Sequence, residues 1–245
     1  MMDIANGDIP TDVARLLSHS RLIAIPKPDG SPRPIALLES VRNVAGNLLL
    51  SQLMPTLKKN FFGLQFAVGV NGGVECCIHA FRTVLMDNPN LAGLLIDFEN
   101  MFNEISREGV LLAVHRQCPD AYPFIYSFYS KGAKIRFQSG DSSYENLFST
   151  QGVFQGDVWG SIASCCLLLD FQSKLNERLL DKNFQTLQLA IADDLTIIGH
   201  PNSIIAAWEF ISEYAPPKLS GIIAPEPFAL KIKVSKCKVF SLAPL

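Results

Sequence analysis

Three pairs of short apolar or alternating segments, each closed by a turn, are interleaved with helical segments, and this order constrains the fold most. The pairs lie at 22–25 and 35–38, 134–138 and 144–149, and 187–191 and 195–198. Such pairs predict β-hairpins. Apolar spacing and caps predict helices at 40–59, with a bend or break at Pro55, and at 74–86, 107–117, 122–129, 160–180 and 201–214. Further strands are expected at 91–96 and within 230–242, and a loop at 216–227. Hairpins between helices favour an α+β fold with an antiparallel or mixed sheet.

The composition is that of a folded protein. The chain has 245 residues, 48% of them hydrophobic, which suffices for one large domain or two closely packed subdomains. No apolar stretch reaches the roughly 18 residues that cross a bilayer, and residues 1–9 do not form a signal peptide. The six cysteines show no zinc-type spacing, which favours reduced, buried thiols. We therefore expect an intracellular protein, nuclear or cytoplasmic, neither secreted nor bound to a membrane.

The net charge of −2 argues against a nucleic-acid partner, because nucleic-acid-binding domains usually carry a basic excess. Any such partner has to be inferred from motifs that outweigh this charge.

Asp193-Asp194 is the most informative dipeptide, because adjacent carboxylates at the end of an apolar hairpin repel each other and lose hydration. A divalent cation relieves both penalties, and Mg²⁺ prefers hard oxygen ligands. Asp97 follows the apolar run 91–96, so two strand ends could bring three carboxylates together. Two-metal sites, with ions about 4 Å apart, use such ligands for phosphoryl transfer. An ordinary solvated turn is the alternative, because Asp is favoured in turns.

Five motifs in order resemble the reverse transcriptases of non-LTR retrotransposons. They span about Arg21 to Phe240, nearly the whole chain. In chain order they are Leu22-Ile-Ala-Ile-Pro26-Lys27-Pro-Asp-Gly30-Ser-Pro-Arg33-Pro34-Ile35, Leu95-Ile-Asp97-Phe98-Glu-Asn100-Met-Phe102-Asn103, Gly152-Val-Phe-Gln155-Gly156-Asp157-Val-Trp-Gly160, Ala192-Asp193-Asp194 and Ser235-Lys236-Cys237. Each motif alone is weak, but the five in the family's order are specific.

The resemblance implies an RNA-directed DNA polymerase with a right-hand fold. Its metal ligands are Asp97, Asp193, Asp194 and the backbone carbonyl of Phe98, which would hold two Mg²⁺ ions, with Mn²⁺ as a possible substitute. The implied partners are an RNA template, a DNA primer and dNTPs.

The resemblance also implies nucleotide-binding residues. Lys27 and Arg33 would hold the triphosphate, and Lys236 would approach the phosphates late in closure. Phe102 would exclude a 2′-hydroxyl, the group that distinguishes RNA from DNA precursors.

Gln155 and Gly156 would lie against the incoming base and the template. Four simpler structural roles stay open: a core Phe at 102, a solvated strand Lys at 236, a turn or helix start at Gly156, and a favourable charge in the first helical turn at Asp157.

The resemblance implies a domain division as well: a fingers-like region with an N-terminal extension at 1–90, and mainly palm at 91–245, with a fingers-type insertion around 110–150. The expected fold is thus an antiparallel palm sheet backed by helices, with the thumb absent and with a thumb and an endonuclease expected elsewhere in a full-length element.

Four departures from the family pattern support an alternative, a catalytically weak or inactive relic that keeps the fold, with or without RNA contact. They are Met101 for Ala, Val158-Trp159 for Pro-Leu, Ile191 for an aromatic residue, and Lys233-Val234 for Asn-Pro.

Overall fold

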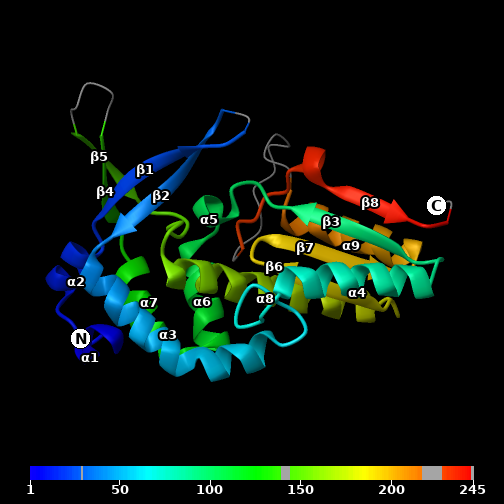
Figure 1. Ribbon diagram of the computed structural model, residues 1–245, viewed down its shortest axis with the longest axis horizontal. Helices are drawn as coiled ribbons and strands as arrows, with labels where there is room; N and C mark the ends of the chain where they lie inside the picture. The colour runs from blue at the N-terminus through cyan, green and yellow to red at the C-terminus, as the bar shows by residue number, and fades with distance from the viewer. Residues whose placement is uncertain (29, 139–143, 217–227, 244–245) are drawn as a thin grey trace.

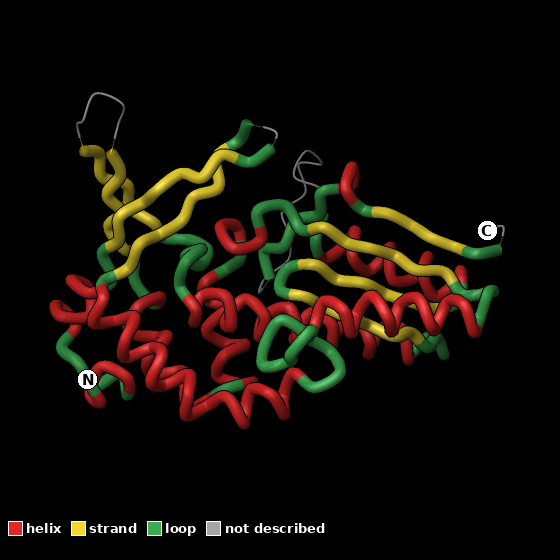
Figure 2. The backbone as a smooth tube through the Cα atoms, viewed as in Figure 1, coloured by secondary structure: helices red, strands yellow, loops and turns green. Residues whose placement is uncertain are grey.

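The protein is represented by a computed structural model, which describes residues 1–245 except 29, 139–143, 217–227 and 244–245. Helices and strands alternate in small groups (Figures 1 and 2). The helices are α1 (Met2–Ala5), α2 (Thr11–Leu17), α3 (Ser40–Phe61), α4 (Gly73–Asp87), α5 (Met101–Glu104), α6 (Arg107–Gln117), α7 (Tyr122–Tyr129), α8 (Val158–Leu180) and α9 (Pro201–Tyr214), with 3₁₀ turns at Pro119–Ala121 and Val234–Lys236. The strands are β1 (Ser20–Pro26), β2 (Pro32–Leu38), β3 (Ala92–Asp97), β4 (Ala133–Gln138), β5 (Tyr144–Ser149), β6 (Thr186–Ile191), β7 (Asp194–Gly199) and β8 (Lys238–Ser241).

Two four-stranded sheets lie at opposite sides of the molecule (Figure 1). The first has the order β2-β1-β4-β5 and consists of two hairpins joined by a parallel pairing, in which Ser20 faces Ile135. The second has the order β6-β7-β3-β8 and is antiparallel throughout. The predicted α+β fold with antiparallel or mixed sheets is confirmed.

The second sheet is covered on both faces. Alternate residues of β6 and β7 enter different apolar clusters: Ala190 and Ile197 join the main core, whereas Leu189 and Ile198 pack with α4 residues such as Cys77. Helices α8 and α9 therefore cover one face and α4 the other. This layering explains why these strands read as continuous apolar runs rather than alternating ones.

The predicted hairpins and helices are found, and their ends lie within three residues of the expected ones. Of the bend or break predicted at Pro55, the break is wrong, because α3 continues to Phe61. Leu57 and Phe61, beyond the proline, are fully buried, and their burial holds the last turns of the helix in place. Residues 230–242 contain one strand and a 3₁₀ turn. The loop expected at 216–227 lies almost wholly outside the described residues.

The cysteines are all free thiols, as expected, and four of them are buried. Cys76 is exposed and Cys237 is half-buried, so the expectation of uniform burial is wrong for these two. Within the described residues, no helix is long and apolar enough to span a bilayer.

Candidate active site

The carboxylates gather where β3 ends and β7 begins. Asp97 is the last residue of β3, and its direct cross-strand partner is Asp194, the first residue of β7. Direct partners in an antiparallel pair project to the same face, with Cα atoms about 5 Å apart. Asp193 lies in the two-residue turn between β6 and β7, because Ile191 pairs with Asp194.

Burial and mutual repulsion shape the electrostatics of this cluster. The pKa of Asp193 is raised, chiefly by desolvation and further by Asp97, while Lys236 and Arg33 counteract the rise. The pKa of Asp194 is raised by desolvation and by the charges of Asp193 and Asp97. The folded protein therefore holds these acids at an electrostatic cost that a bound cation would relieve.

Lys236 compensates part of this negative charge. Its Nζ lies 3.2 Å from Oδ2 of Asp97. Of the structural alternative, a solvated strand lysine, only the strand is wrong: Lys236 lies in the 3₁₀ turn before β8, and its ion-paired side chain is 58% exposed. Within the described part of the chain, no group of three or more His, Cys, Asp or Glu side chains is arranged to hold a metal ion.

The backbone at Phe98 is oriented by hydrogen bonds to the segment 231–233. The bonds from Glu99 N to Lys231 O (2.7 Å) and from Lys233 N to Asp97 O (2.9 Å) flank the bridge between Phe98 and Ile232. In this bridge type the carbonyl of Phe98 points away from Ile232. The ring is buried and packs edge-on against Phe171, with centroids 5.8 Å apart.

Phe102 and Met101 differ in burial although they are adjacent in α5. Met101 is 2% exposed and belongs to the core, whereas Phe102 is half-buried and only packs against it. The carbonyl of Phe102 accepts a 2.6 Å bond from Val153 N, which fixes α5 against the segment that leads to Gln155.

Gly156 has a structural reason to be glycine. Its φ is +105°, and a Cβ there would lie 2.6 Å from the carbonyl oxygen of Ala36 in β2. The carbonyl of Gln155 accepts a 2.7 Å bond from Ala36 N. This loop is thus docked on the first sheet. Gly156 lies in a turn before α8, as the structural alternative for this residue predicts.

Lys27 and Arg33 belong to the β1–β2 hairpin, which reaches toward the centre of the molecule (Figure 1). Arg33 is exposed and lies within electrostatic reach of Asp193. Lys27 is half-buried at the start of the turn, where its N–H donates to Ser31 O.

Comparison with known proteins shows which of them this chain resembles in sequence or in fold. No protein-family model matches the chain. The Retrotransposable element SLACS 132 kDa protein of Trypanosoma brucei gambiense is 29% identical over 205 residues, which are 82% of this chain and 17% of the relative. Apo telomerase from Candida tropicalis, truncated from its C-terminal domain, matches 92% of this chain and 50% of its own, with a TM-score of 0.68 and 17% identity. The RNA-dependent RNA polymerase of a human picobirnavirus matches 91% of this chain and 42% of its own, with a TM-score of 0.58 and 15% identity.

The chain has the right-hand polymerase fold. The predicted fold class is confirmed by the structural matches, and the predicted resemblance to a retrotransposon protein by the sequence match. The chain spans 17% of the length of the retrotransposon protein and about half of the telomerase chain.

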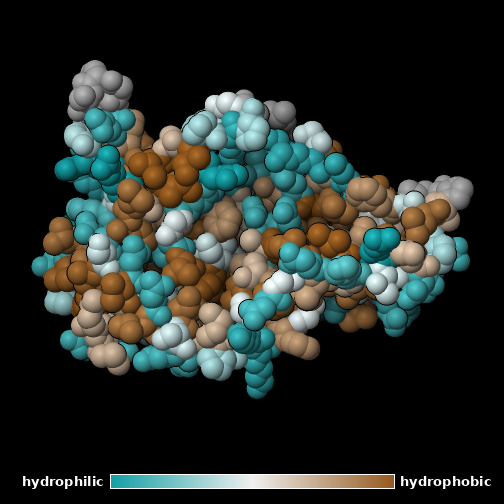
Figure 3. Space-filling model, viewed as in Figure 1, coloured by the Kyte–Doolittle hydropathy of each residue, from teal (hydrophilic) through white to brown (hydrophobic). Residues whose placement is uncertain are grey.

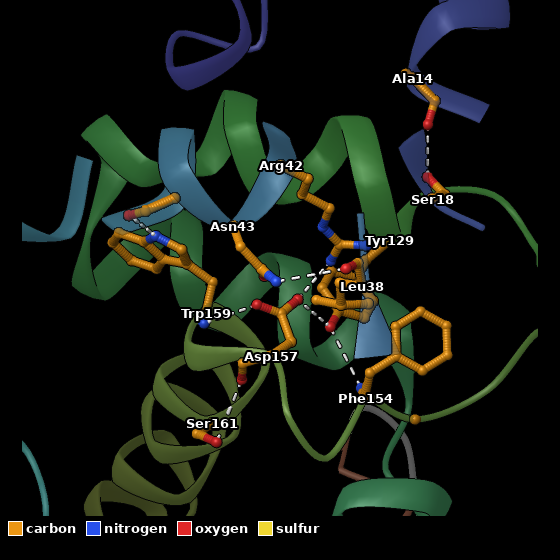
Figure 4. A network of polar contacts seen from close by, with 12 residues as sticks. Ala14, Ser18, Leu38, Arg42, Asn43, Tyr129, Phe154, Asp157, Trp159 and Ser161 are labelled. Atoms are coloured by element: carbon orange, nitrogen blue, oxygen red, sulfur yellow. Dashed lines mark hydrogen bonds and ion pairs between the residues drawn. The ribbon is translucent and has the colours of Figure 1, made fainter. Parts of the chain in front are cut away.

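A buried polar network, which sequence reasoning missed, fixes the Gln155–Gly156 loop in this polymerase fold (Figure 4). Asp157 caps α8 by accepting from Trp159 N, and its other carboxylate oxygen binds Arg42 of α3 and the hydroxyl of Tyr129. Tyr129 OH also accepts from Phe154 N, at 3.3 Å. Burial, then the Asp157 carboxylate, raises the pKa of Tyr129 far above its usual value, so the hydroxyl stays protonated and donates.

Arg107, also missed, supports the other end of the same loop. It is buried, and its guanidinium donates to the carbonyls of Gly152 (2.8 Å), Lys131 and Ser149. Its isolated position in the sequence gives no signal of this role, because its acceptors are backbone groups from distant segments.

Proposed function

We propose that this chain is the fingers-and-palm part of an RNA-directed DNA polymerase, which adds deoxynucleotides to a primer 3′-hydroxyl by a two-metal mechanism. The observation that carries the proposal is the direct cross-strand pairing of Asp97 with Asp194, beside the turn that holds Asp193. The similarity to the retrotransposon protein and to the solved polymerases supports the proposal as well.

The donor atoms are of the type that a pair of hard cations prefers, although among the described residues the carboxylates are not gathered closely enough to hold one. Asp97, Asp193, Asp194 and the Phe98 carbonyl would hold two Mg²⁺ ions, or Mn²⁺, and the raised pKa values of Asp193 and Asp194 mark sites where added positive charge is favoured. The bound ions would supply charge stabilisation for in-line displacement. Lys236 has to leave Asp97 for this ligand set to close, which frees its ammonium group for the phosphates.

The nucleotide would lie between the β1–β2 hairpin and the carboxylates. Arg33, already within the field of Asp193, and Lys27 would bind the triphosphate. Phe102 would lie beside the sugar. Gln155 and Gly156 would lie beside the base, in a loop already fixed against β2.

We propose that the first sheet, β2-β1-β4-β5, belongs to the fingers and the second to the palm. Residues 1–90 then form the fingers-like region with its N-terminal extension, and 91–245 form mainly palm. The fingers-type insertion around 110–150 is supported by the pairing of β4 with β1.

The outward face of the first sheet has the chemistry of a single-stranded nucleic-acid surface. Arg21 and Arg136 are exposed neighbours in register, Lys134 lies beside them, and the Arg136 guanidinium lies 5.9 Å from the Tyr144 ring. None of these three cations pairs with an acid among the described residues. Together with His19, Ser20 and Glu39 they line a groove of about 500 Å³.

Apolar side chains continue this face along β1 and β2, where Ile23, Ile25 and Leu37 are exposed; Figure 3 shows hydrophobic surface over these strands. Bases stack or pack on such groups, and phosphates bind the cations. We assign this surface to the RNA template, and the DNA primer to the carboxylate end of the palm sheet. A solved telomerase of similar fold is in complex with a fragment of telomeric RNA.

The second candidate is a catalytically weak or inactive relic. The Lys236–Asp97 ion pair favours it, because the pair occupies a carboxylate that the metal site needs.

A primer-extension assay separates the two candidates. The 245-residue chain is incubated with an RNA template, a DNA primer and Mg²⁺ or Mn²⁺, with dNTPs or NTPs, beside Asp193→Asn as the control. Incorporation of dNTPs by the parent chain, but not by the Asp193→Asn variant, supports the polymerase function. No incorporation with either metal, together with retained RNA binding, supports the relic.

A further inference from the structure

The side chain of Gln65 contacts the turn that carries Asp193. Gln65 lies in the loop between α3 and α4, and it is 1% exposed. The loop adds a short parallel pairing to β6, in which Phe66 N donates to Ala190 O and Ala190 N donates to Leu64 O, both at 2.8 Å. This pairing places the Gln65 amide directly beside Ala192.

Both backbone groups of Ala192 bind this amide. Ala192 N donates to Gln65 Oε1 at 2.9 Å, and Gln65 Nε2 donates to Ala192 O at 3.1 Å. Ala67 N also donates to Oε1, at 3.1 Å. Two N–H donors on one side and a carbonyl on the other fix the orientation of the amide. Since the carbonyl of Ala192 belongs to the peptide that links it to Asp193, the contact sets the position of the carboxylate-bearing residue.

The turn needs such a restraint because Ala192 has a φ of +53°. Asp193, the second residue of the turn, is not among the residues with positive φ. This is the pattern of a type II′ turn, whose first position normally holds glycine. A residue with a Cβ is disfavoured there and persists only when its surroundings hold it.

We propose that Gln65 is a positioning residue, whose side-chain amide holds Ala192 in the left-handed conformation and thereby sets the position of Asp193 for catalysis. The role in catalysis rests on the proposed function, whereas the restraint of the turn does not. Among the described residues, the Gln65 side chain bonds to Ala192 and Ala67 and to none of the three carboxylates, so it acts through the backbone of Ala192.

The first test is Gln65→Leu, which keeps the approximate volume and removes all three hydrogen bonds. We expect amide hydrogen exchange to rise in a peptide spanning 186–199. The kcat for dNTP incorporation is expected to fall about 10- to 100-fold, the scale of a misplaced catalytic group, while KM stays within about threefold. A general loss of packing would instead speed exchange across the whole chain and would not separate kcat from KM.

The second test is rescue by Ala192→Gly, because glycine adopts the left-handed conformation without a restraint. In the Gln65→Leu background it should restore kcat about tenfold, the order of the penalty that a Cβ brings to this conformation. A defect confined to loop packing has no reason to respond to a change at position 192.

Gln172→Leu is the matched control. Gln172 is also 1% exposed, and its amide has no hydrogen-bond partner among the described residues. Because Gln172 lines a pocket with Thr186 and Gln188 of β6, exchange near the start of β6 can change, but exchange at 190–199 and kcat should stay unchanged. Unchanged exchange in Gln65→Leu, or failure of Ala192→Gly to rescue a folded double variant, overturns the proposal. If the parent incorporates no nucleotide, the proposed function fails, and the exchange comparison still decides whether Gln65 restrains the turn.

Discussion

Asp193 is held at an electrostatic cost in the folded chain, because burial and the charge of Asp97 raise its pKa. We therefore expect Asp193→Asn to abolish nucleotide incorporation while leaving the free energy of unfolding unchanged or higher at pH 7. A primer-extension assay and urea denaturation measure the two effects. A large loss of stability would instead mark Asp193 as a structural residue.

The stability effect of Asp193→Asn should depend on pH. A carboxyl whose pKa is higher in the folded state stabilises the fold below its unfolded pKa, and this contribution is lost as the pH rises through the folded pKa. The advantage of the Asn variant should therefore grow between about pH 4 and pH 7.

Phe102 is predicted to exclude the 2′-hydroxyl, and its half-buried position leaves a face free for a sugar. Phe102→Val should raise the incorporation of NTPs relative to dNTPs by about tenfold or more, which corresponds to roughly 1.4 kcal/mol of discrimination. Met101 points into the core, so its side chain has little freedom to fill the vacated space. An unchanged ratio of the two incorporation efficiencies would reduce Phe102 to a packing residue.

At the scale of elements, local sequence patterns predicted the individual hairpins and helices. The hairpin that carries Asp193 and helix α8 follow from apolar runs in the sequence. The parallel pairing of β1 with β4 could not be predicted, because it joins segments more than 100 residues apart and depends on tertiary packing. The continuation of α3 past Pro55 has the same cause, because buried contacts override the local preference.

The Arg42–Asp157 contact joins α3 to the start of α8, and both side chains are at least 96% buried. Arg42→Met should destabilise the fold by about 3–5 kcal/mol, because it leaves a buried carboxylate without its cation. Arg116→Met is the matched control: its ion pair with Asp170 has an arginine that is 51% exposed, and its loss should cost about 1 kcal/mol or less. Equal losses in urea denaturation would contradict the role of this network.

At the scale of the whole molecule, the candidate site was predictable in its carboxylates but not in its supports. Asp97 and Asp194 each border an apolar strand, and the register pairs them as that pattern suggests. Gln65, Arg42 and Arg107 escaped notice because their partners lie far away in sequence or are backbone groups, which leave no pattern of residue types.

The net charge of −2 does not exclude the proposed nucleic-acid surface, because the net charge averages over surfaces that differ. Arg21, Lys134 and Arg136 are concentrated on one face of the first sheet, so a basic surface exists in spite of the acidic total. Local concentration of charge, not the sum, determines where a polyanion binds.

The 245-residue chain should therefore bind single-stranded RNA through this face, and fluorescence anisotropy at several salt concentrations measures it. Lys134→Ala and Arg136→Ala should each weaken binding and reduce the slope of log K against log salt by about 1, because each releases one counterion fewer. Tyr144→Ala should cost about 1–3 kcal/mol, the value of one stacked base, with the slope unchanged. Lys182→Ala is the charge-matched control, since Lys182 is paired with Glu209 at the far end of α8. If Lys182→Ala reduces the slope as much as Arg136→Ala does, the RNA responds only to the overall charge, and the first sheet is not its binding surface.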